Sequence, residues 1–155
     1  IEHGYFISDE EIELLLQSGR WLVMTPSIFF TDERIWTLPP NLVDGHLQQR
    51  EEVRLRLTAA VKAGVKYAAG TDAMHGGLGK ELQYLTDFGA SPLEALKAAT
   101  SRAAELCGLA DKIGIIASGY QADIIAVDGN PVEDIRAVQR VRTVVQAGRV
   151  IKSFN

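Results

Sequence analysis

The fold is decided by a short stretch, VKYAAGTD at residues 65–72. Its mainly apolar first part, residues 65–69, is typical of a strand buried on both faces of a parallel sheet. Gly70 ends the run, and Asp72 follows closely. The stretch therefore predicts a short parallel strand with a carboxylate just beyond its carboxyl end.

Strand-and-helix alternation continues on both sides of this stretch. The run from Trp21 to Thr25 has the same apolar character and stops at Pro26, which cannot continue a ladder of hydrogen bonds. Apolar residues at helical spacing, capping residues and terminal glycines together predict helices at about residues 8–19, 44–63, 78–88 and 91–107. This order of elements predicts a parallel α/β fold.

Residues 27–41 interrupt the alternation, because they have neither the helical nor the strand period. A long irregular segment within a domain usually serves function, and this one carries Phe29, Phe30 and Trp36. We expect these aromatic side chains to form either one wall of a substrate pocket or a small satellite core beneath the loop.

The C-terminal part has a different character. Residues 122–127 predict a strand that ends at a turn over residues 128–131. Alternating apolar positions from Val141 to Val145 predict a hairpin with Val150 and the residue after it. We therefore predict two units, an α/β unit over residues 1–112 and a β-strand tail over residues 113–155.

Composition restricts the classes of function. The 155 residues include 16 basic and 20 acidic side chains, for a net charge of −4, and 46% are hydrophobic. This balance is typical of a soluble globular protein and argues against nucleic-acid binding, which needs a strongly basic patch. No apolar run approaches the roughly 20 residues of a membrane-spanning helix. The single cysteine, Cys107, excludes an intrachain disulfide, fits a reducing cytoplasm, and is expected to be a small buried side chain.

Three polar residues mark the ends of predicted parallel strands. His3, Thr25 and Asp72 each follow such a strand, and all carboxyl ends of a parallel barrel open on one face. Imidazole and carboxylate groups are common ligands of a hydrolytic metal ion, although a catalytic zinc generally needs three protein ligands. Spacing alone leaves other interpretations open, with His3 a terminal surface histidine, Asp72 a helix cap and Thr25 merely the end of a strand.

Five motifs resemble the metal-dependent amidohydrolase superfamily, in the branch of imidazolonepropionase-like hydrolases and prolidase-like peptidases. The motifs are IEHG at 1–4, GTDA at 70–73, SPLEALKAAT at 91–100, AAELCGL at 103–109 and GYQADIIAVDGNP at 119–131. The resemblance implies the C-terminal part of a (β/α)8 TIM barrel, about strands six to eight with their helices. It also implies that the tail is a remnant of a small accessory β-sandwich.

The same resemblance implies roles for individual residues. His3 is expected to bind a metal, or in one-metal members to contact substrate or the activated water. Asp72 is expected to bind metal and to act as general base and acid. His75 is expected to contact substrate, with a solvated loop histidine as the alternative. The implied reaction is hydrolysis of a C–N bond in a small amide, cyclic amide or dipeptide, with a divalent metal, zinc by default, or manganese or iron.

The chain also departs from the family pattern. The His-x-His pair of strand one, the carboxylated lysine of strand four and the histidine of strand five have no counterpart, and His46 is expected to be merely exposed. The chain opens without an initiator methionine, so we expect further polypeptide before Ile1. We predict that this chain alone is inactive, and that it forms a homo-oligomer or associates with the missing N-terminal part. The alternative function is a non-catalytic α/β fragment or assembly module.

Overall fold

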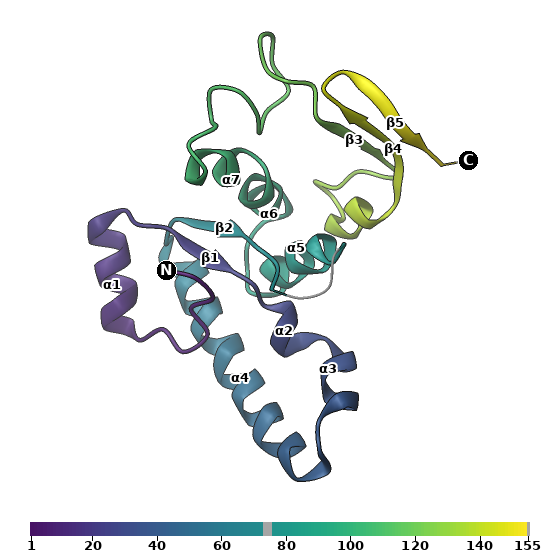
Figure 1. The fold of residues 1–155 in the computed structure, drawn as a ribbon. Coiled ribbons are helices and arrows are strands. Elements are labelled where there is room, and N and C mark those ends of the chain that lie inside the picture. The colour runs from purple at the N-terminus through teal and green to yellow at the C-terminus, as the bar shows by residue number, and fades with distance from the viewer. Residues whose placement is uncertain (73–75, 155) are drawn as a thin grey trace.

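A short parallel ladder lies at the centre of the fold. The computed structural model describes residues 1–72 and 76–154, with only the backbone at position 34 (Figure 1). Strands β1 (Leu22–Met24) and β2 (Tyr67–Ala69) pair in parallel. On the other side of β1, Glu2 forms a parallel bridge with Val23. The predicted parallel strands and the α/β class are therefore confirmed.

Seven α-helices and one 3-10 helix are present in the described part of the chain. Their bounds are α1 (Asp9–Ser18), α2 (Ser27–Phe30), α3 (Asp32–Thr37), α4 (Pro40–Ala63), α5 (Leu78–Asp87), α6 (Pro92–Ala99), α7 (Ser101–Leu106) and η1 (Ile135–Gln139). The caps behave as their sequences indicate. Ser8 and Glu11 form a reciprocal capping box at α1, and the left-handed Gly19 ends that helix. Ser91 accepts a hydrogen bond from the backbone of Glu94 at α6.

Two expected elements differ from the structure. Residues 27–41 are not irregular, because they contain the short helices α2 and α3. These helices are too short to display a helical period in the sequence. The helix expected over residues 91–107 is divided at Thr100, which has φ −126° and ψ −95° and whose hydroxyl donates to the Leu96 carbonyl. Such local hydroxyl-to-carbonyl bonds compete with helix continuation.

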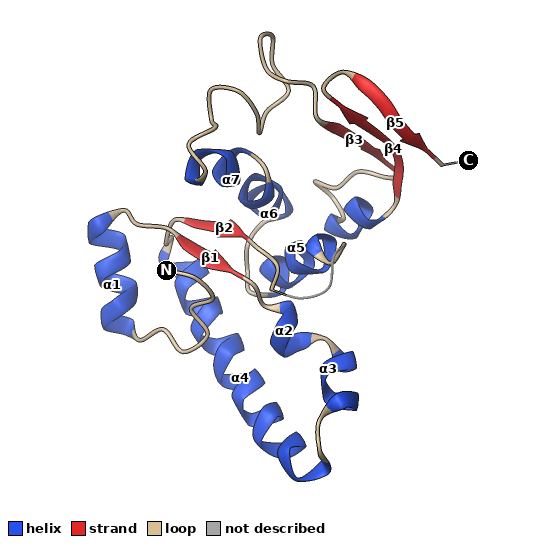
Figure 2. Ribbon diagram, viewed as in Figure 1, coloured by secondary structure: helices blue, strands red, loops and turns tan. Residues whose placement is uncertain are grey.

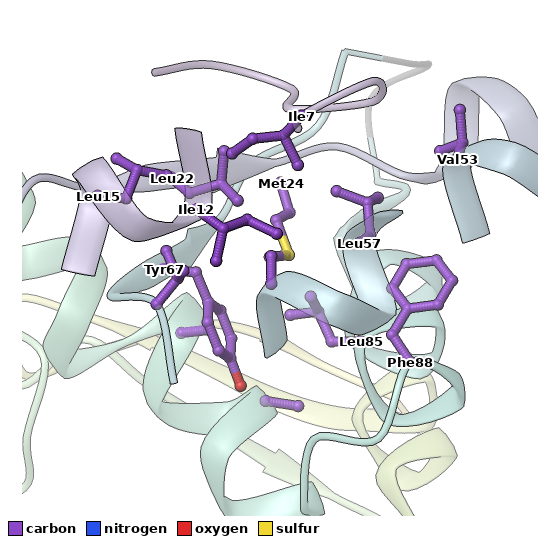
Figure 3. Close-up of a cluster of buried hydrophobic side chains, with 14 of the residues drawn as sticks. Ile7, Ile12, Leu15, Leu22, Met24, Val53, Leu57, Tyr67, Leu85 and Phe88 are labelled. Atoms are coloured by element: carbon purple, nitrogen blue, oxygen red, sulfur yellow. The ribbon is translucent and has the colours of Figure 1, made fainter. Parts of the chain in front are cut away.

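The core lies where helices pack against the parallel strands. Leu22 and Met24 of β1 are completely buried, as are Leu57 of α4 and Leu85 of α5. Figure 3 shows these side chains converging with Phe88, which follows α5. Val23, which points to the opposite face of β1, is half-buried, so both faces are at least partly covered and the sequence shows a continuous apolar run instead of an alternating one.

The C-terminal tail forms a separate antiparallel sheet. Its strands are β3 (Ile124–Val127), β4 (Val141–Gln146) and β5 (Arg149–Ser153), in the order β3-β4-β5 (Figure 2). Ala147 and Gly148 both have positive φ, as a tight two-residue hairpin turn requires. The predicted hairpin is confirmed. In the described ranges, no helix has the length and apolar character needed to cross a membrane.

Candidate functional site

His3 is held in an uncommon backbone conformation where the first parallel segment ends. Its φ is 70°, in the left-handed region that non-glycine residues rarely adopt, and Gly4 follows with φ 66°. The His3 N–H still donates to the Val23 carbonyl at 2.7 Å. A Cβ atom at Gly4 would lie 2.6 Å from Leu22 Cδ1. The chain therefore turns away from the sheet immediately after His3, and only glycine fits the next position without displacing the core.

Thr25 joins the ends of two parallel segments. It follows β1, is only 4% exposed, and its Oγ1 lies 2.8 Å from Nδ1 of His3. The Tyr5 hydroxyl donates to the Thr25 carbonyl at 3.0 Å and lies 2.6 Å from Thr25 Oγ1. The sequence indicated Thr25 only as a strand end, whereas the structure places it in direct contact with a predicted site residue.

Aromatic rings extend from His3 towards α4. The ring centroids of His3 and Tyr5 are 5.3 Å apart, and those of Tyr5 and Phe29 are 4.6 Å apart. Phe29 stacks on His46 at 5.6 Å with an interplanar angle of 3°. His46 is therefore not merely exposed, as expected, but half-buried against an aromatic ring.

The other aromatic residues of the segment have different surroundings. Phe29 and Phe30 pack against the main core, so they do not form the separate satellite core that was one of the two expectations. Trp36 is 77% exposed. The segment is therefore anchored to the core through α2, while α3 presents its tryptophan to solvent.

Asp72 follows β2, and its exposed carboxylate lies within electrostatic reach of two groups, the half-buried Tyr5 and the buried Glu81. Burial raises the pKa of the Tyr5 phenol, the hydrogen bond with Thr25 opposes this, and the negative charge of Asp72 adds to the rise. The same charge contributes to the raised pKa of Glu81. The charge of Asp72 thus raises the pKa of Tyr5, whose ring lies beside that of His3. The predicted substrate contact His75 lies outside the described residues.

Glu81 is a buried acid that the sequence analysis did not identify. It is fully buried, and its two carboxylate oxygens accept hydrogen bonds from the backbone N–H of Ser27, at 2.9 Å, and from the Ser27 hydroxyl. Burial raises the pKa of Glu81, while both bonds from Ser27 oppose the rise. In the sequence, Glu81 lies one turn before Leu85 on the apolar face of α5, and this position could have predicted that its side chain is buried.

A cavity of about 550 Å³ opens on the side of the sheet where both strands end. Its lining includes Ser27, which follows β1, and four residues that follow β2, namely Gly76, Gly77, Gly79 and Lys80. Lys80 and Glu33 form an ion pair at 3.5 Å between two residues of this lining. The cavity therefore lies beyond the carboxyl ends of the strands, where parallel α/β folds bind ligands.

A second, mainly apolar groove of about 610 Å³ lies between the α6–α7 pair and β3. Its lining includes Leu96, Ile113, Ile125 and Cys107. The expectation that Cys107 is buried is wrong, because the thiol is exposed at this groove. Its helix ends one residue earlier, at Leu106, so the cysteine is not packed within an apolar helix. The cytoplasmic location inferred partly from this residue stays a prediction.

The available donors suit a divalent metal in type but are too few in number. His3 offers an imidazole whose Nδ1 is already fixed by Thr25, a common arrangement around metal-binding histidines. Asp72 offers carboxylate oxygens. Within residues 1–72 and 76–154, no three His, Cys, Asp or Glu side chains are grouped closely enough to hold a metal. These residues therefore fit as part of a ligand set that needs at least one donor from elsewhere.

Comparison with known sequences gives matches over the whole chain. The profile of the amidohydrolase family matches residues 1–151. Ochratoxinase from Aspergillus niger is 35% identical over 166 residues, covering 99% of this chain and 33% of that protein. Imidazolonepropionase from Shouchella clausii is 33% identical over 102 residues, covering 60% of this chain and 23% of that protein. The chain thus spans a third or less of the length of these curated relatives.

Solved structures agree with this result. A Xaa-Pro dipeptidase with bound methionine in its active site superposes with a TM-score of 0.88 at 34% identity, covering 99% of this chain and 39% of that one. The A. niger ochratoxinase structure superposes with a TM-score of 0.84 at 33% identity, covering 98% of this chain and 36% of that one. The likeness therefore includes the parallel ladder, the helices and the antiparallel tail.

Proposed function

Because this chain belongs to the amidohydrolase family, we propose that it is the part of a metal-dependent hydrolase that carries His3 and Asp72. The reaction is hydrolysis of a C–N bond in a small amide, cyclic amide or dipeptide. The names of its relatives support this class, since they include a Xaa-Pro dipeptidase and an ochratoxinase. The observation that carries the proposal is the contact of His3 with Thr25 at the ends of adjacent parallel segments.

The fold position of the chain forms part of this proposal. The segment at Glu2, then β1, then β2 are strands six, seven and eight of a (β/α)8 barrel. Residues 113–155 belong to an accessory β-sandwich. The order of the three parallel segments supports this assignment, as does the fraction of each relative that the chain covers. The remaining strands come from further polypeptide.

Each site group has a defined task. A divalent metal ion, zinc by default with manganese or iron suited to the same donors, would supply Lewis-acid activation of the carbonyl and of water. His3 Nε2 and the Asp72 carboxylate would be two of its ligands. Asp72 accepts the proton of the attacking water and returns it to the leaving amine nitrogen. His75, which follows Asp72 closely in sequence, contacts the substrate.

The cavity between Ser27 and residues 76–80 supports a small-molecule substrate. Its volume of about 550 Å³ lies in the usual range for sites that enclose a small ligand. Its lining includes the polar side chains of Ser27, Thr31, Glu33, Lys80 and Gln139, but not His3 or Asp72. A dipeptide or a compact amide has the size and polarity that such a site accommodates.

The decisive experiment compares zinc content and dipeptide or amide hydrolysis in the complete barrel protein and in its variants. His3→Ala and Asp72→Asn should each lower kcat by roughly 10²–10⁴-fold, since each removes a ligand or the proton-transfer group. His46→Gln is the matched control and should leave both readouts unchanged. Metal-free, inactive wild-type protein would instead favour a non-catalytic assembly module.

The 155-residue chain alone gives a second test. We propose that the outer edge of the Glu2 segment pairs with the preceding part of the polypeptide or with a second copy, because unpaired strand edges promote association. Light scattering should show oligomers or co-assembly with the missing part, and the isolated chain should not turn over substrate. A well-behaved monomer at micromolar concentration would contradict the association. Turnover by the chain alone would contradict its predicted inactivity.

A further inference from the structure

The hydroxyl of Thr25 lies between two groups that compete for its hydrogen. Nδ1 of His3 is 2.8 Å from Thr25 Oγ1, and the Tyr5 hydroxyl oxygen is 2.6 Å from the same atom. The Tyr5 hydroxyl also donates to the Thr25 carbonyl at 3.0 Å. Three contacts therefore connect the side chains of His3, Tyr5 and Thr25 and the Thr25 carbonyl. Thr25, only 4% exposed, has little access to water as an alternative partner.

Counting hydrogens distinguishes the two neutral forms of His3. Tyr5 and Thr25 each have one hydroxyl hydrogen, and neutral imidazole carries one N–H. With that hydrogen on Nδ1, His3 donates to Thr25 Oγ1, Thr25 donates to the Tyr5 oxygen, and Tyr5 donates to the Thr25 carbonyl. With it on Nε2, only two hydrogens remain for the three contacts. Only the Nδ1–H tautomer gives each contact its own hydrogen.

We propose that Thr25 and Tyr5 are positioning residues that hold His3 as the Nδ1–H tautomer and so leave the lone pair on Nε2. This inference rests on the proposed function, in which that lone pair binds a divalent metal. The left-handed backbone at His3 adds a second constraint, because it fixes the direction in which the imidazole side chain leaves the main chain. A hydrogen-bond partner that sets the tautomer of a ligating histidine is a general feature of metal sites, and here a hydroxyl takes that part.

The test reads the tautomer directly, without metal or substrate. The 155-residue chain contains three histidines, so long-range ¹H–¹⁵N correlation spectra of histidine-labelled protein are simple to assign with single His→Gln variants. Wild-type His3 should show the Nδ1–H pattern. Tyr5→Phe removes the acceptor of the Thr25 hydrogen, which is then free for Nδ1, so the population should shift towards Nε2–H. Tyr120→Phe is the matched control, because its hydroxyl bonds to the Ala110 carbonyl instead.

Thr25 variants extend the test to metal affinity in the complete barrel protein. Thr25→Val should weaken Zn²⁺ binding by roughly 10–100-fold, and Thr25→Ser, which keeps the hydroxyl, should restore it. An Nε2–H pattern in wild type, or an unchanged pattern in Tyr5→Phe, would overturn the proposal even if one Thr25 variant fails to fold. A wild-type Nδ1–H pattern in a protein that binds no zinc would refute the proposed function and leave the tautomer assignment intact.

Discussion

The two β-structures of this chain use similar residues but bury them to opposite extents. In β1, Leu22 and Met24 are completely buried, whereas in β5 Val150 is 66% and Ile151 58% exposed. Figure 2 shows the reason, since helices surround β1 and β2, whereas β5 is an outer strand of its sheet. Burial therefore follows from what covers a strand and not from the hydrophobicity of the strand itself.

The difference in burial between the two β-structures also explains where the candidate site lies. The parallel segment at Glu2, β1 and β2 form a layer against which helices pack, here called the covered layer. It is followed by His3, Thr25 and Asp72, so buried neighbours fix the backbone from which these side chains project. The exposed sheet contributes no residue to the cavity beyond Val141, at the start of β4. Substitutions that loosen the covered layer should therefore affect both stability and the site, whereas substitutions on β5 should affect neither.

The largest expected difference between the two regions comes from truncating apolar side chains. Leu57→Ala in α4 removes a fully buried side chain and should lower the free energy of unfolding by about 2–5 kcal/mol. Ile151→Ala in β5 should change it by less than about 0.5 kcal/mol, as is usual for exposed positions. Urea unfolding followed by circular dichroism measures both. Similar losses for the two variants would show that β5 is covered in solution.

Two left-handed glycines sharpen the comparison at the level of the backbone. Gly4→Ala and Gly148→Ala both force alanine to positive φ, at a cost of about 1–2 kcal/mol each. Only Gly4 has a close neighbour, Leu22, whose displacement adds about 1–3 kcal/mol of overpacking. Thermal unfolding should therefore show Gly4→Ala to be the more destabilising change. Equal losses of stability in the two variants would mean that Leu22 moves aside at little energetic cost.

The smallest expected effect concerns the buried acid of the covered layer. Glu81→Ala should destabilise by about 1–3 kcal/mol, because the backbone N–H and hydroxyl of Ser27 lose their acceptor. Asp134→Ala, at the exposed N-cap of η1, should cost less. Chemical unfolding at a single pH compares the two, and an equal or larger loss for Asp134→Ala would contradict the importance of burial.

The pH dependence of stability gives Glu81 an independent signature. Its pKa is raised above the ordinary value in the folded state, mainly by burial, so the folded state binds this proton more tightly than the unfolded state. Its contribution is fully present below the ordinary glutamate pKa and is lost as pH rises through the raised pKa. Glu81→Gln should flatten that slope of stability against pH. An unchanged slope would show that other groups cause this pH dependence of stability.

Much of the covered layer was predictable because its signals are local. Capping residues marked α1, and apolar runs marked β1 and β2. Helices α2 and α3 were not predicted, since helices of four and six residues complete too few turns to show a period. Cys107 was expected inside a helix that in fact ends just before it.

The site was predictable only in outline. Strand ends indicated His3 and Asp72, whose roles stay predictions. The contact of Thr25 and the buried position of Glu81 were not predicted, because their partners are distant in sequence, 22 positions for the His3–Thr25 contact and 54 for Ser27–Glu81. A hydroxyl or carboxylate has no periodicity of its own, so only the assembled tertiary structure reveals such pairs.

The exposed thiol of Cys107 gives the protein a built-in reporter position. As the chain has no other cysteine, a maleimide dye attaches at one place, on the wall of the apolar groove between α6–α7 and β3. The emission wavelength of an environment-sensitive dye then follows the local polarity. A blue shift on addition of another polypeptide would register shielding of this groove from water, without any engineered substitution.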